Sequence, residues 1–282
     1  MILDGKLVRQ ELLKKLYKKY ENINPGLVVI QVGDDFASTK YIRQKEKLAN
    51  ELGVNFKLLK YDNIRTSELV GVIEKLNDNQ EVDGIIVQLP LPKTINYDLV
   101  RNSIDPKKDI DGVNDENRVA LLDNNENGMI PCTALGIIKI LDYYNIDVSG
   151  KDVVIIGRSI HIGLPLYSLL LNRDATITMC HSKTKDIKKY TKNADIIISS
   201  VGKPNFITQD MVREDVCLID VGFNYYNGKI CGDVSQNLTK YKYLTPVPGG
   251  VGQMTVYSIY ENLYKAYYLN RKDNKKILLK NS

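Results

Sequence analysis

Four polar residues in the first half of the chain have side chains that suit proton transfer and ligand binding. Tyr41 and Lys45 stand four residues apart in a segment with a helical pattern, so their side chains are neighbours on one helix face. Gln88 interrupts an apolar segment at the C-terminal end of an expected strand, where ligands collect in open α/β sheets. Asp111 follows Asp109 in a loop that begins with a proline.

A lysine that is partly buried in a cleft can act as a general acid or base near neutral pH. A neutral amide such as Gln88 can orient that lysine without adding charge. A carboxylate such as Asp111 can accept a pair of hydrogen bonds from an aminopyrimidine-like ring. Each residue alone is more often structural, because a Tyr/Lys pair at this spacing usually lies on a solvated helix face. The set therefore predicts a catalytic site only if all of its members face one cleft.

A second group of residues matches the geometry of a dinucleotide site. The apolar strand Val153–Ile156 runs directly into Gly157, Arg158 and Ser159, and an apolar helix follows. The glycine spacing departs from GxGxxG, so the generic fingerprint is a weak match. Arg158, together with Ser182 after the next strand, suits a 2′-phosphate and therefore favours NADP over NAD. The alternative is a surface arginine and a helix cap at Ser182.

A loop near the C-terminus, Thr245–Thr255, combines two prolines with three glycines. Pro248, Gly249 and Gly250 leave bare backbone groups at close range, which suits a ligand that lies against the main chain. A helical pattern begins at Met254. A tight connection without a ligand is an equally good interpretation of this loop taken alone.

The elements that must position these residues alternate along the chain. Short apolar strands and amphipathic helices follow one another almost throughout, which indicates an α/β protein with two α/β domains and mostly parallel sheets. The expected strands are Leu27–Val32, Asn55–Tyr61, Gly84–Leu89, Asp152–Ile156, Ala175–Met179, Asp195–Ser199 and Val216–Val221. The expected helices cover residues 5–21, 37–52, 67–77 and 132–144.

The composition excludes several classes of protein. Only two histidines are present, and the four cysteines form no CxxC pair, so a His-rich metal site and a disulfide scaffold are poorly supplied. No apolar run reaches membrane-spanning length and no signal peptide is evident, which predicts a cytoplasmic protein. The net charge of +5 is mild, and its one basic cluster, from Arg271 to Lys280, is expected to be a solvated end without nucleic-acid binding.

Eight ordered motifs together resemble the bifunctional methylenetetrahydrofolate dehydrogenase/methenyltetrahydrofolate cyclohydrolase family. The resemblance covers the chain from about Asp4 to about Tyr264. The motifs are Val32-Gly-Asp-Asp with Ser38, Tyr41 and Lys45, Asp83–Pro92, Lys108–Gly112, Pro131-Cys-Thr133, Gly157-Arg-Ser159, Cys180-His-Ser182, Asp220-Val-Gly222 and the loop Thr245–Thr255.

The resemblance implies that 5,10-methylenetetrahydrofolate is oxidised with NADP⁺ and that the 5,10-methenyl product is hydrolysed to 10-formyltetrahydrofolate, in one cleft between the two domains. It implies that Lys45 is the key catalytic residue, that Gln88 tunes it, that Tyr41 packs on the folate ring and that Asp111 holds the pterin. It further assigns NADP to Gly157, Arg158, Ser159, Ser182 and Phe223, and a folate-side wall to Pro248, Gly249 and Gly250. No metal is implied.

The same resemblance implies a folate-binding catalytic domain over residues 1–125, a Rossmann-like NADP-binding domain over residues 126–254, and a last helix, about 255–282, that packs back on the first domain. It also implies a homodimer. Four residues depart from the family pattern, namely Gln253, Ala134 and Phe36, which stand where proline is usual, and His161, which replaces an aliphatic residue. Because Gln253 lacks the rigid ring of proline, we expect the loop Thr245–Thr255 to be more mobile here than in relatives with proline at this position.

Three other functions remain open. A monofunctional dehydrogenase, possibly using NAD, is disfavoured because Lys45, Gln88 and Asp111 are all present, and because Arg158 and Ser182 favour NADP. A silent nucleotide- or folate-binding module would be expected to lack at least one of these groups. An unrelated two-domain dehydrogenase would leave the set around Lys45 unexplained.

Overall fold

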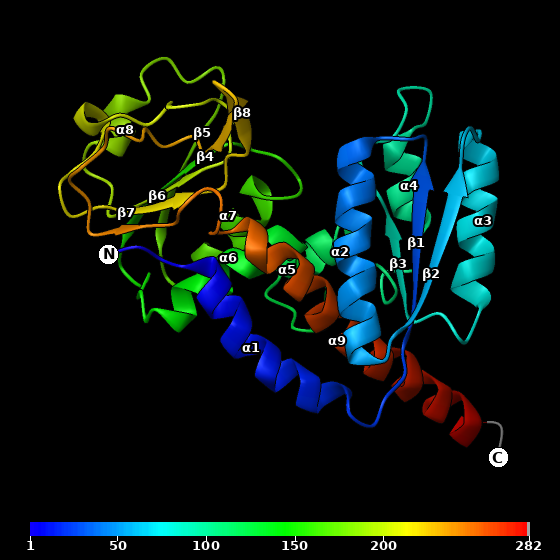
Figure 1. Ribbon diagram of the computed structural model, residues 1–282. Coiled ribbons are helices and arrows are strands. Elements are labelled where there is room, and N and C mark those ends of the chain that lie inside the picture. The colour runs from blue at the N-terminus through cyan, green and yellow to red at the C-terminus, as the bar shows by residue number, and fades with distance from the viewer. Residues whose placement is uncertain (281–282) are drawn as a thin grey trace. The chain divides into compact units, whose positions relative to one another are not determined.

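The computed structural model describes residues 1–280, with side chains for all of these except residue 37 and residues 272–280. It forms two compact units (Figure 1). The five-stranded unit contains Met1–Leu12, Leu121–Asn124 and Pro131–Ser258, and the three-stranded unit contains Leu13–Ala120, Asn125–Ile130 and the chain from Ile259 onward. Of the basic cluster, only the Arg271 side chain lies within the described part, so the expectation of a solvated end falls outside the described residues.

The five-stranded unit is built on a fully parallel sheet with the strand order β10-β7-β6-β4-β5. The strands that form it are β4 (Asp152–Ile156), β5 (Thr176–Cys180), β6 (Ile196–Ser199), β7 (Cys217–Asp220) and β10 (Tyr243–Leu244). From β4 the chain crosses to β5 on one side and then returns to β6 on the other. The carboxyl ends of β4 and β6 therefore form a topological switch point, where ligands bind in such sheets.

Helices and one hairpin complete this unit. They are α6 (Cys132–Tyr143), α7 (Gly163–Leu171), α8 (Lys188–Thr191), the 3₁₀ turn η1 (Gln209–Met211) and the antiparallel pair β8 (Asn224–Tyr226) and β9 (Lys229–Cys231). Helix α7 packs on β4 and β5. The four cysteines are all free, as the sequence predicted, and all four are buried.

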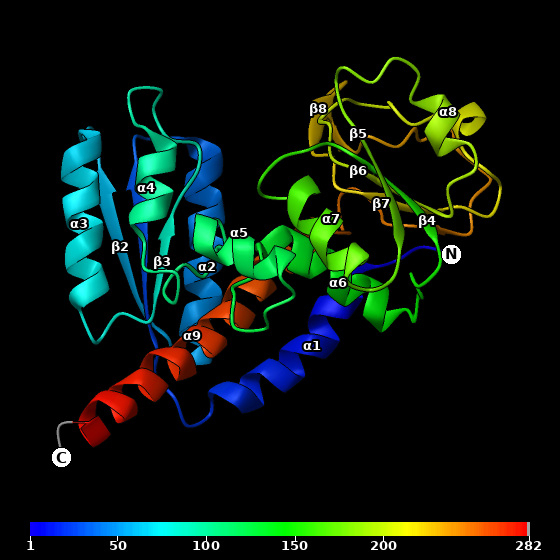
Figure 2. The ribbon, with the colours of Figure 1, turned by 180° about the vertical axis from the view of Figure 1, so that it is seen from behind.

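The three-stranded unit has a parallel sheet in the order β2-β1-β3, with a helix after each strand. Its elements are β1 (Gly26–Val32), α2 (Phe36–Leu52), β2 (Asn55–Tyr61), α3 (Thr66–Asp78), β3 (Gly84–Val87), α4 (Tyr97–Ser103) and α5 (Asp115–Leu122), of which α5 ends in the other unit. Alternate residues of β1, such as Val28 and Ile30, pack with Leu69 of α3 and Val100 of α4 in one core. Helix α2 lies on the opposite face of this sheet (Figures 1 and 2).

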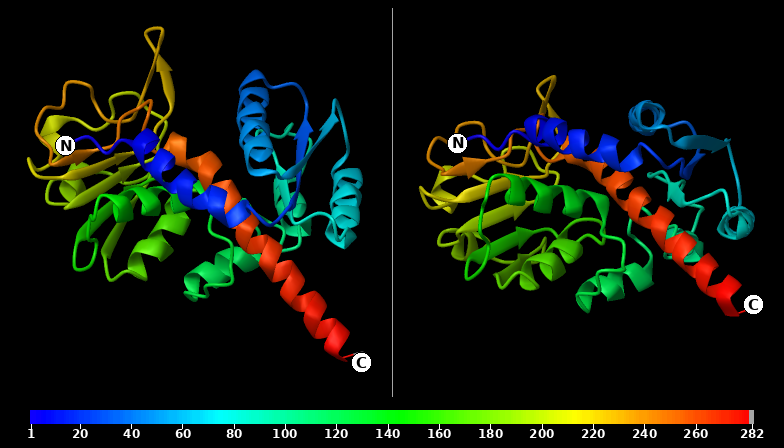
Figure 3. Two further views of the ribbon diagram at one scale, coloured as in Figure 1. Left: turned by 60° about the horizontal axis from the view of Figure 1, so that its bottom comes forward. Right: turned by 90° about the horizontal axis from the view of Figure 1, so that it is seen from below.

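Two long helices, α1 (Gly5–Tyr20) and α9 (Gly252–Lys280), contribute residues to both units. Within the three-stranded unit the end of α1 runs beside α9 (Figure 3), where the Tyr20 hydroxyl donates to the Tyr260 carbonyl at 2.7 Å and Lys19 pairs with Glu261. The Leu263 side chain of α9 packs so closely on Gly84 that a Cβ there would lie 2.8 Å from it. The later part of α9 therefore packs on the sheet of the first half of the chain, as the sequence predicted.

The expected strands and helices all form, with shifts of one or two residues at some of their ends. The short elements α4, α5, α8, η1 and β10 were not foreseen, nor was the β8–β9 hairpin, which turns at Asn227 and Gly228 with positive φ at both. Strand β3 is shorter than predicted, because it ends at Val87 rather than at Leu89.

Among the described residues, none of the helices combines the length and the apolar character that crossing a membrane requires.

Candidate active site

The ammonium group of Lys45 is held against the side chain of Gln88. The Lys45 Nζ donates to the Gln88 Oε1 at 2.8 Å, and Lys45 is only 8% exposed. The Gln88 Nε2 in turn donates to the Leu89 carbonyl at 2.7 Å, which fixes the amide with its oxygen toward the lysine. The Gln88 oxygen is a neutral acceptor, so this hydrogen bond orients the Lys45 ammonium without adding charge.

The topology of the small sheet places this pair. After β1 the chain crosses through α2 to β2 and then through α3 to β3 on the other side of β1, so the switch point lies between the carboxyl ends of β1 and β3. Gln88 follows β3 directly, and its N–H still pairs with Ile30 of β1 at 2.8 Å. The loop after β1 ends at Asp35, whose carboxylate caps α2 at the Ser38 N–H. The Ser38 hydroxyl donates to the Leu89 carbonyl at 2.9 Å, tying the start of α2 to the end of β3.

Tyr41 and Asp111 lie in the same unit as this pair. Tyr41 is 39% exposed, one helical turn before Lys45 on α2, which leaves its ring available to a ligand. Asp109 forms a parallel bridge with Ile85 of β3, so the register carries Asp111 alongside the end of that strand. Asp111 is partly exposed and borders a small cavity that is also lined by Val87, Tyr97, Arg101 and Asp109.

Asp109 is the fully buried carboxylate behind Asp111. It accepts hydrogen bonds from the Asn114 N–H at 2.7 Å, the Asn117 amide at 2.9 Å and the Gly112 N–H at 3.1 Å. Burial raises the pKa of Asp109 to about 7, although these hydrogen bonds oppose the shift. The three bonds fold the loop tightly around the Asp109 side chain and so fix the backbone from which Asp111 projects.

In the other unit, the turn after β4 has the geometry of a phosphate-binding turn. Gly157 has φ of 126°, and a Cβ on it would lie 2.4 Å from the Ser200 hydroxyl oxygen, which follows β6. A Cβ on Gly163 would lie 2.2 Å from the Gly157 carbonyl oxygen. Glycine is therefore required at both ends of the turn, because only then can the start of α7 approach β4. The N-terminal N–H groups of α7 favour an anion there.

Arg158 and Ser159 are exposed within this turn, and Ser182 is exposed just after β5. The Ser159 hydroxyl accepts from the Ile162 N–H at 3.2 Å, which shapes the turn before α7. The chain after β5 is a tight turn in which the Thr184 hydroxyl accepts from the His181 N–H at 2.9 Å. These residues fit a nucleotide phosphate, because a guanidinium and hydroxyls stand at the carboxyl edge of the sheet next to a helix N-terminus.

Two buried carboxylates organise the rest of this edge. Asp233 is fully buried and accepts from the Ser199 hydroxyl, the Val201 and Lys203 N–H groups and the Asn224 amide, at 2.8–3.1 Å. Asp220, at the end of β7, accepts from three backbone N–H groups, those of Gly222, Asp233 and Val234. Burial raises the pKa of Asp220 to about 6, against the effect of these hydrogen bonds. Asp220 and Asp233 together tie the loops after β6 and β7 to the segment that follows β9.

Phe223 and the proline–glycine loop also belong to the five-stranded unit. Phe223 is 63% exposed in the loop after β7. Pro248 follows a cis peptide bond, and the Gly249 carbonyl accepts from the Lys6 N–H at 3.2 Å. The Gln253 N–H donates to the Gly250 carbonyl at 3.1 Å, a hydrogen bond that proline at this position could not make.

The structure thus gathers Tyr41, Lys45, Gln88 and Asp111 in one unit and the predicted cofactor residues, with Pro248–Gly250, in the other. Sequence reasoning gave no role to Asp233, and it assigned no function to Asp109 or Asp220 individually. A signal was present for Asp220, because a carboxylate at the end of an apolar strand requires hydrogen-bond donors. None marked Asp233, whose partners lie up to 34 residues away.

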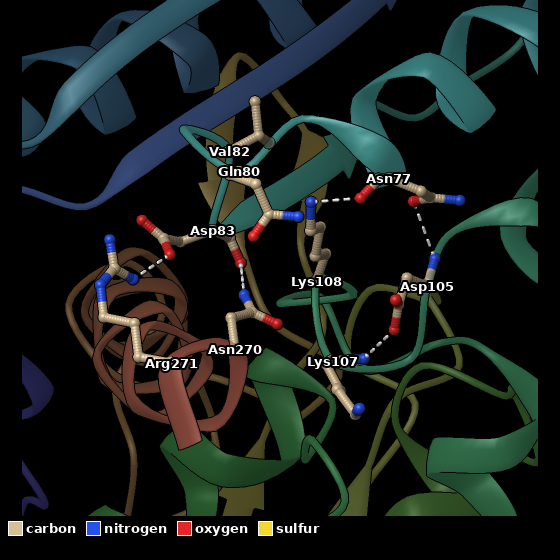
Figure 4. A pocket seen from close by; sticks show the side chains of 9 residues that line it. All are labelled: Asn77, Gln80, Val82, Asp83, Asp105, Lys107, Lys108, Asn270 and Arg271. Atoms are coloured by element: carbon tan, nitrogen blue, oxygen red, sulfur yellow. Dashed lines mark hydrogen bonds and ion pairs between the residues drawn. The ribbon is translucent and has the colours of Figure 1, made fainter. Parts of the chain in front are cut away.

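A larger polar cavity lies before the amino end of β3, away from Gln88 (Figure 4). Lys108, which lines the cavity, is buried and donates to the carbonyls of Leu76, Asn77 and Asn79 at the end of α3. Arg271, which also lines the cavity, pairs with Asp83 at 2.5 Å. Because Lys108 and Arg271 both have protein partners, we interpret this cavity as structural.

Comparison with known proteins places the chain in a family. The model of the catalytic domain of tetrahydrofolate dehydrogenase/cyclohydrolase matches residues 3–111, and that of the NAD(P)-binding domain of the same family matches residues 131–271. The bifunctional protein FolD of Aquifex aeolicus is 46% identical over 277 residues, covering 95% of each chain. That of Bacillus subtilis is 45% identical over 274 residues, covering 94% of this chain and 96% of the relative.

Solved structures agree with these relatives. The crystal structure of the bifunctional enzyme FolD from Campylobacter jejuni aligns with a TM-score of 0.92 at 42% identity, covering 95% of this chain and 98% of that one. The Trypanosoma brucei dehydrogenase-cyclohydrolase, complexed with NADP cofactor and an inhibitor, aligns with a TM-score of 0.88 at 30% identity, covering 95% of this chain and 97% of that one. With both family domains matched in order and these relatives covered almost end to end, the chain belongs to the tetrahydrofolate dehydrogenase/cyclohydrolase family.

Proposed function

We propose that this protein is a bifunctional enzyme that oxidises 5,10-methylenetetrahydrofolate to 5,10-methenyltetrahydrofolate with NADP⁺ and then hydrolyses the product to 10-formyltetrahydrofolate. The observation that carries the proposal is the buried hydrogen bond of 2.8 Å between Lys45 and Gln88 at the switch point of the small sheet. A dehydrogenase alone needs no such proton-transfer group, because hydride transfer from a carbon between two nitrogens depends mainly on alignment.

The hydrolytic step needs control of protons. Addition of water to the methenyl carbon and opening of the ring release one proton overall, and we assign its handling to the Lys45 amine. Gln88 accepts a hydrogen bond from the ammonium form and keeps the lysine directed toward the site. Tyr41 offers its ring to the folate, and the Asp111 carboxylate binds the N–H groups of the pterin. These four residues form the folate-binding, catalytic half of the protein.

The five-stranded unit is the nucleotide-binding half. NADP⁺, when bound, accepts the hydride. We assign its pyrophosphate to the turn that contains Gly157 and Ser159, where the α7 N-terminus offers N–H groups, and its 2′-phosphate to Arg158 and Ser182. We further assign the nicotinamide end to the main chain around Phe223.

In this scheme the loop backbone of Pro248, Gly249 and Gly250 is the contribution of the five-stranded unit to folate binding. The domain assignment is then residues 1–125 with the last helix for folate, and residues 126–254 for NADP.

One absorbance experiment tests the proposal. Methylenetetrahydrofolate is added with NADP⁺ or with NAD⁺, and the reduced nicotinamide and the methenyl species are followed at their separate wavelengths. We expect reduced NADP to form faster than reduced NAD, and added methenyltetrahydrofolate to be hydrolysed faster than in buffer. Reduced cofactor without accelerated hydrolysis would instead identify a monofunctional dehydrogenase.

We also propose that the protein is a cytoplasmic homodimer, as the family resemblance implies. The chain has a mass of 32.0 kDa, so sedimentation equilibrium should give twice this value. A single species at the mass of one chain at micromolar concentration would contradict the dimer.

A further inference from the structure

Helix α9 touches the backbone of both segments that carry the assigned catalytic residues. Its Tyr260 is fully buried, and its hydroxyl donates to the main-chain carbonyl of Lys45 at 2.5 Å. Two residues further on, Asn262 is 3% exposed, and its amide donates at 2.9 Å to the carbonyl of Ile110, which directly precedes Asp111. All of these residues belong to the three-stranded unit.

The Tyr260 hydroxyl enters the hydrogen-bond ladder of α2. In a regular α-helix the Lys45 carbonyl would accept from the Ala49 N–H alone. Here the Tyr260 hydroxyl donates to the Lys45 carbonyl and also accepts from the Ala49 N–H. Burial raises the pKa of Tyr260, so that the hydroxyl keeps its proton and remains a donor. The turn of α2 that begins at Lys45 is thereby tied to α9.

The amide of Asn262 spans two segments in the same way. Besides Ile110, it donates to the Ile130 carbonyl at 2.8 Å. Both hydrogens of one amide group are therefore used on carbonyls that are 20 positions apart in the sequence, counting from 110 to 130. This contact ties the loop that holds Asp111 to α9, the helix to which Lys45 is also tied.

We propose that Tyr260 and Asn262 are positioning residues that set the spacing between Lys45 and Asp111. Asp111 orients the substrate and Lys45 handles the proton, so the reacting carbon meets the Lys45 amine only if the two segments keep their separation. A displacement of about 1 Å in such a geometry can cost about 100-fold in rate. This inference rests on the function proposed above.

The chain supplies a matched control for each residue. Tyr20 is a second buried tyrosine, and its hydroxyl donates to the Tyr260 carbonyl rather than to α2. Asn270 lies on the same helix as Asn262, and its amide donates at 3.3 Å to the carbonyl of Asp83, which precedes β3 at the end opposite to Gln88. Replacing a control residue removes a similar hydrogen bond without touching the segments of Lys45 or Asp111.

The first test compares Tyr260→Phe with Tyr20→Phe. We expect Tyr260→Phe to lower kcat of the cyclohydrolase about tenfold, with KM for methenyltetrahydrofolate unchanged, because a shift of well under 1 Å at Lys45 affects the reacting geometry more than binding. The pH–rate profile should also shift, because the surroundings of the amine that handles the proton change. Tyr20→Phe should leave kcat and the profile unchanged. If Tyr260→Phe does not fold, Tyr260→Met serves instead.

The second test compares Asn262→Ala with Asn270→Ala. Loss of the Ile110 contact should raise KM for the folate at least threefold in both reactions, because Asp111 binds the substrate in both. The cyclohydrolase pH–rate profile should stay in place. Wild-type kinetics in Tyr260→Phe and Asn262→Ala, or equal effects in the control variants, would overturn the proposal and leave only a packing role.

A third measurement does not depend on turnover. Competitive labelling with acetic anhydride, followed by mass spectrometry, reports the reactivity of Lys45 relative to the exposed Lys151. We expect labelling of Lys45 to change severalfold in Tyr260→Phe and to remain at the wild-type rate in Tyr20→Phe. A wild-type protein without cyclohydrolase activity would reject the proposed function, whereas unchanged labelling in Tyr260→Phe would reject the positioning role.

Discussion

At the scale of single residues, the chemistry depends on which partner each charged group has. Lys45 donates to an amide oxygen of Gln88, whereas buried Lys108 donates to three helix-end carbonyls, and buried Arg101 pairs with Asp98 and Asp115. The last two arrangements complete a helix end and an ion pair, so they serve the fold. The first directs the Lys45 ammonium with a neutral acceptor at the carboxyl end of β3, which suits a group that exchanges protons.

Replacing Lys45 with methionine should abolish cyclohydrolase turnover and leave NADP binding intact. The thioether fills a similar volume but carries no proton, and removal of a general acid–base group typically costs about 10²–10⁴ in rate. Hydrolysis of methenyltetrahydrofolate and fluorescence titration with reduced NADP measure the two properties. Lys47→Met, at an exposed position on the same helix, is the control. Full hydrolytic activity in Lys45→Met would remove the role that we assign to the lysine.

Replacing Arg158 with alanine should weaken NADP binding much more than NAD binding. The guanidinium is exposed in the turn after β4, where it can pair with the additional phosphate of NADP. We expect KM for NADP⁺ to rise about tenfold or more, which corresponds to one charge-assisted hydrogen bond of about 1.5–3 kcal/mol. KM for NAD⁺ should change less than threefold. Equal losses for both cofactors would mean that Arg158 does not read the 2′-phosphate.

At the scale of elements, the carboxyl edges of the two sheets are fixed by buried side chains that take no direct part in the chemistry. Asp233 binds the end of β6, the loop that follows β6, and the start of β8, and so holds these three segments together. Asp109 fixes the loop beside β3. These carboxylates accept neutral donors from backbone and side chains within the described part of the chain. Buried charge of this kind is costly unless every lone pair has a donor, so each loop is held in one conformation.

Replacing Asp233 with asparagine should destabilise the protein by about 2–4 kcal/mol, because an amide NH₂ would face donors that now bind a carboxylate oxygen. Urea unfolding gives this free energy. Asp215→Asn, at an exposed ion pair with Arg213, should cost much less, because exposed ion pairs contribute little to stability. A loss at Asp233 as small as that at Asp215 would show that the loops do not depend on the buried carboxylate.

At the scale of the whole molecule, two buried carboxylates make stability depend on pH. Burial raises the pKa of Asp220 from 3.8 to about 6 and that of Asp109 from 3.8 to about 7. A raised pKa in the folded state means that folding favours the protonated form. The stability contribution of these groups is therefore fully present below about pH 3.8 and is lost as the pH rises to about 6 and 7.

This dependence can be measured as a difference between variants. The free energy of unfolding of the wild type should fall relative to that of Asp220→Asn between pH 4 and pH 6 or so, since the asparagine does not titrate. The same comparison with Asp109→Asn should extend to about pH 7. Differences that stay constant over this range would contradict the raised pKa values.

The sequence by itself determined the class of fold, the order of the elements and the family. Alternating apolar strands and amphipathic helices are local patterns with periods of two and 3.6 residues, so β2 and β4 could be placed to the residue. The fold class and the family expected from the motifs are confirmed, and the family's NAD(P)-binding domain agrees with the expected nicotinamide cofactor. The individual site residues stay predictions.

The tertiary structure alone decided which side chains meet. The Lys45–Gln88 hydrogen bond joins residues 43 positions apart, the Asp233 network joins loops up to 34 positions apart, and Tyr260 reaches Lys45 across 215 positions. No local period encodes such pairs, because they depend on the crossover order of the sheets and on where α9 packs. Tyr260 illustrates the limit, since in the sequence it is one more apolar position of a helix, and only burial against α2 gives its hydroxyl a partner.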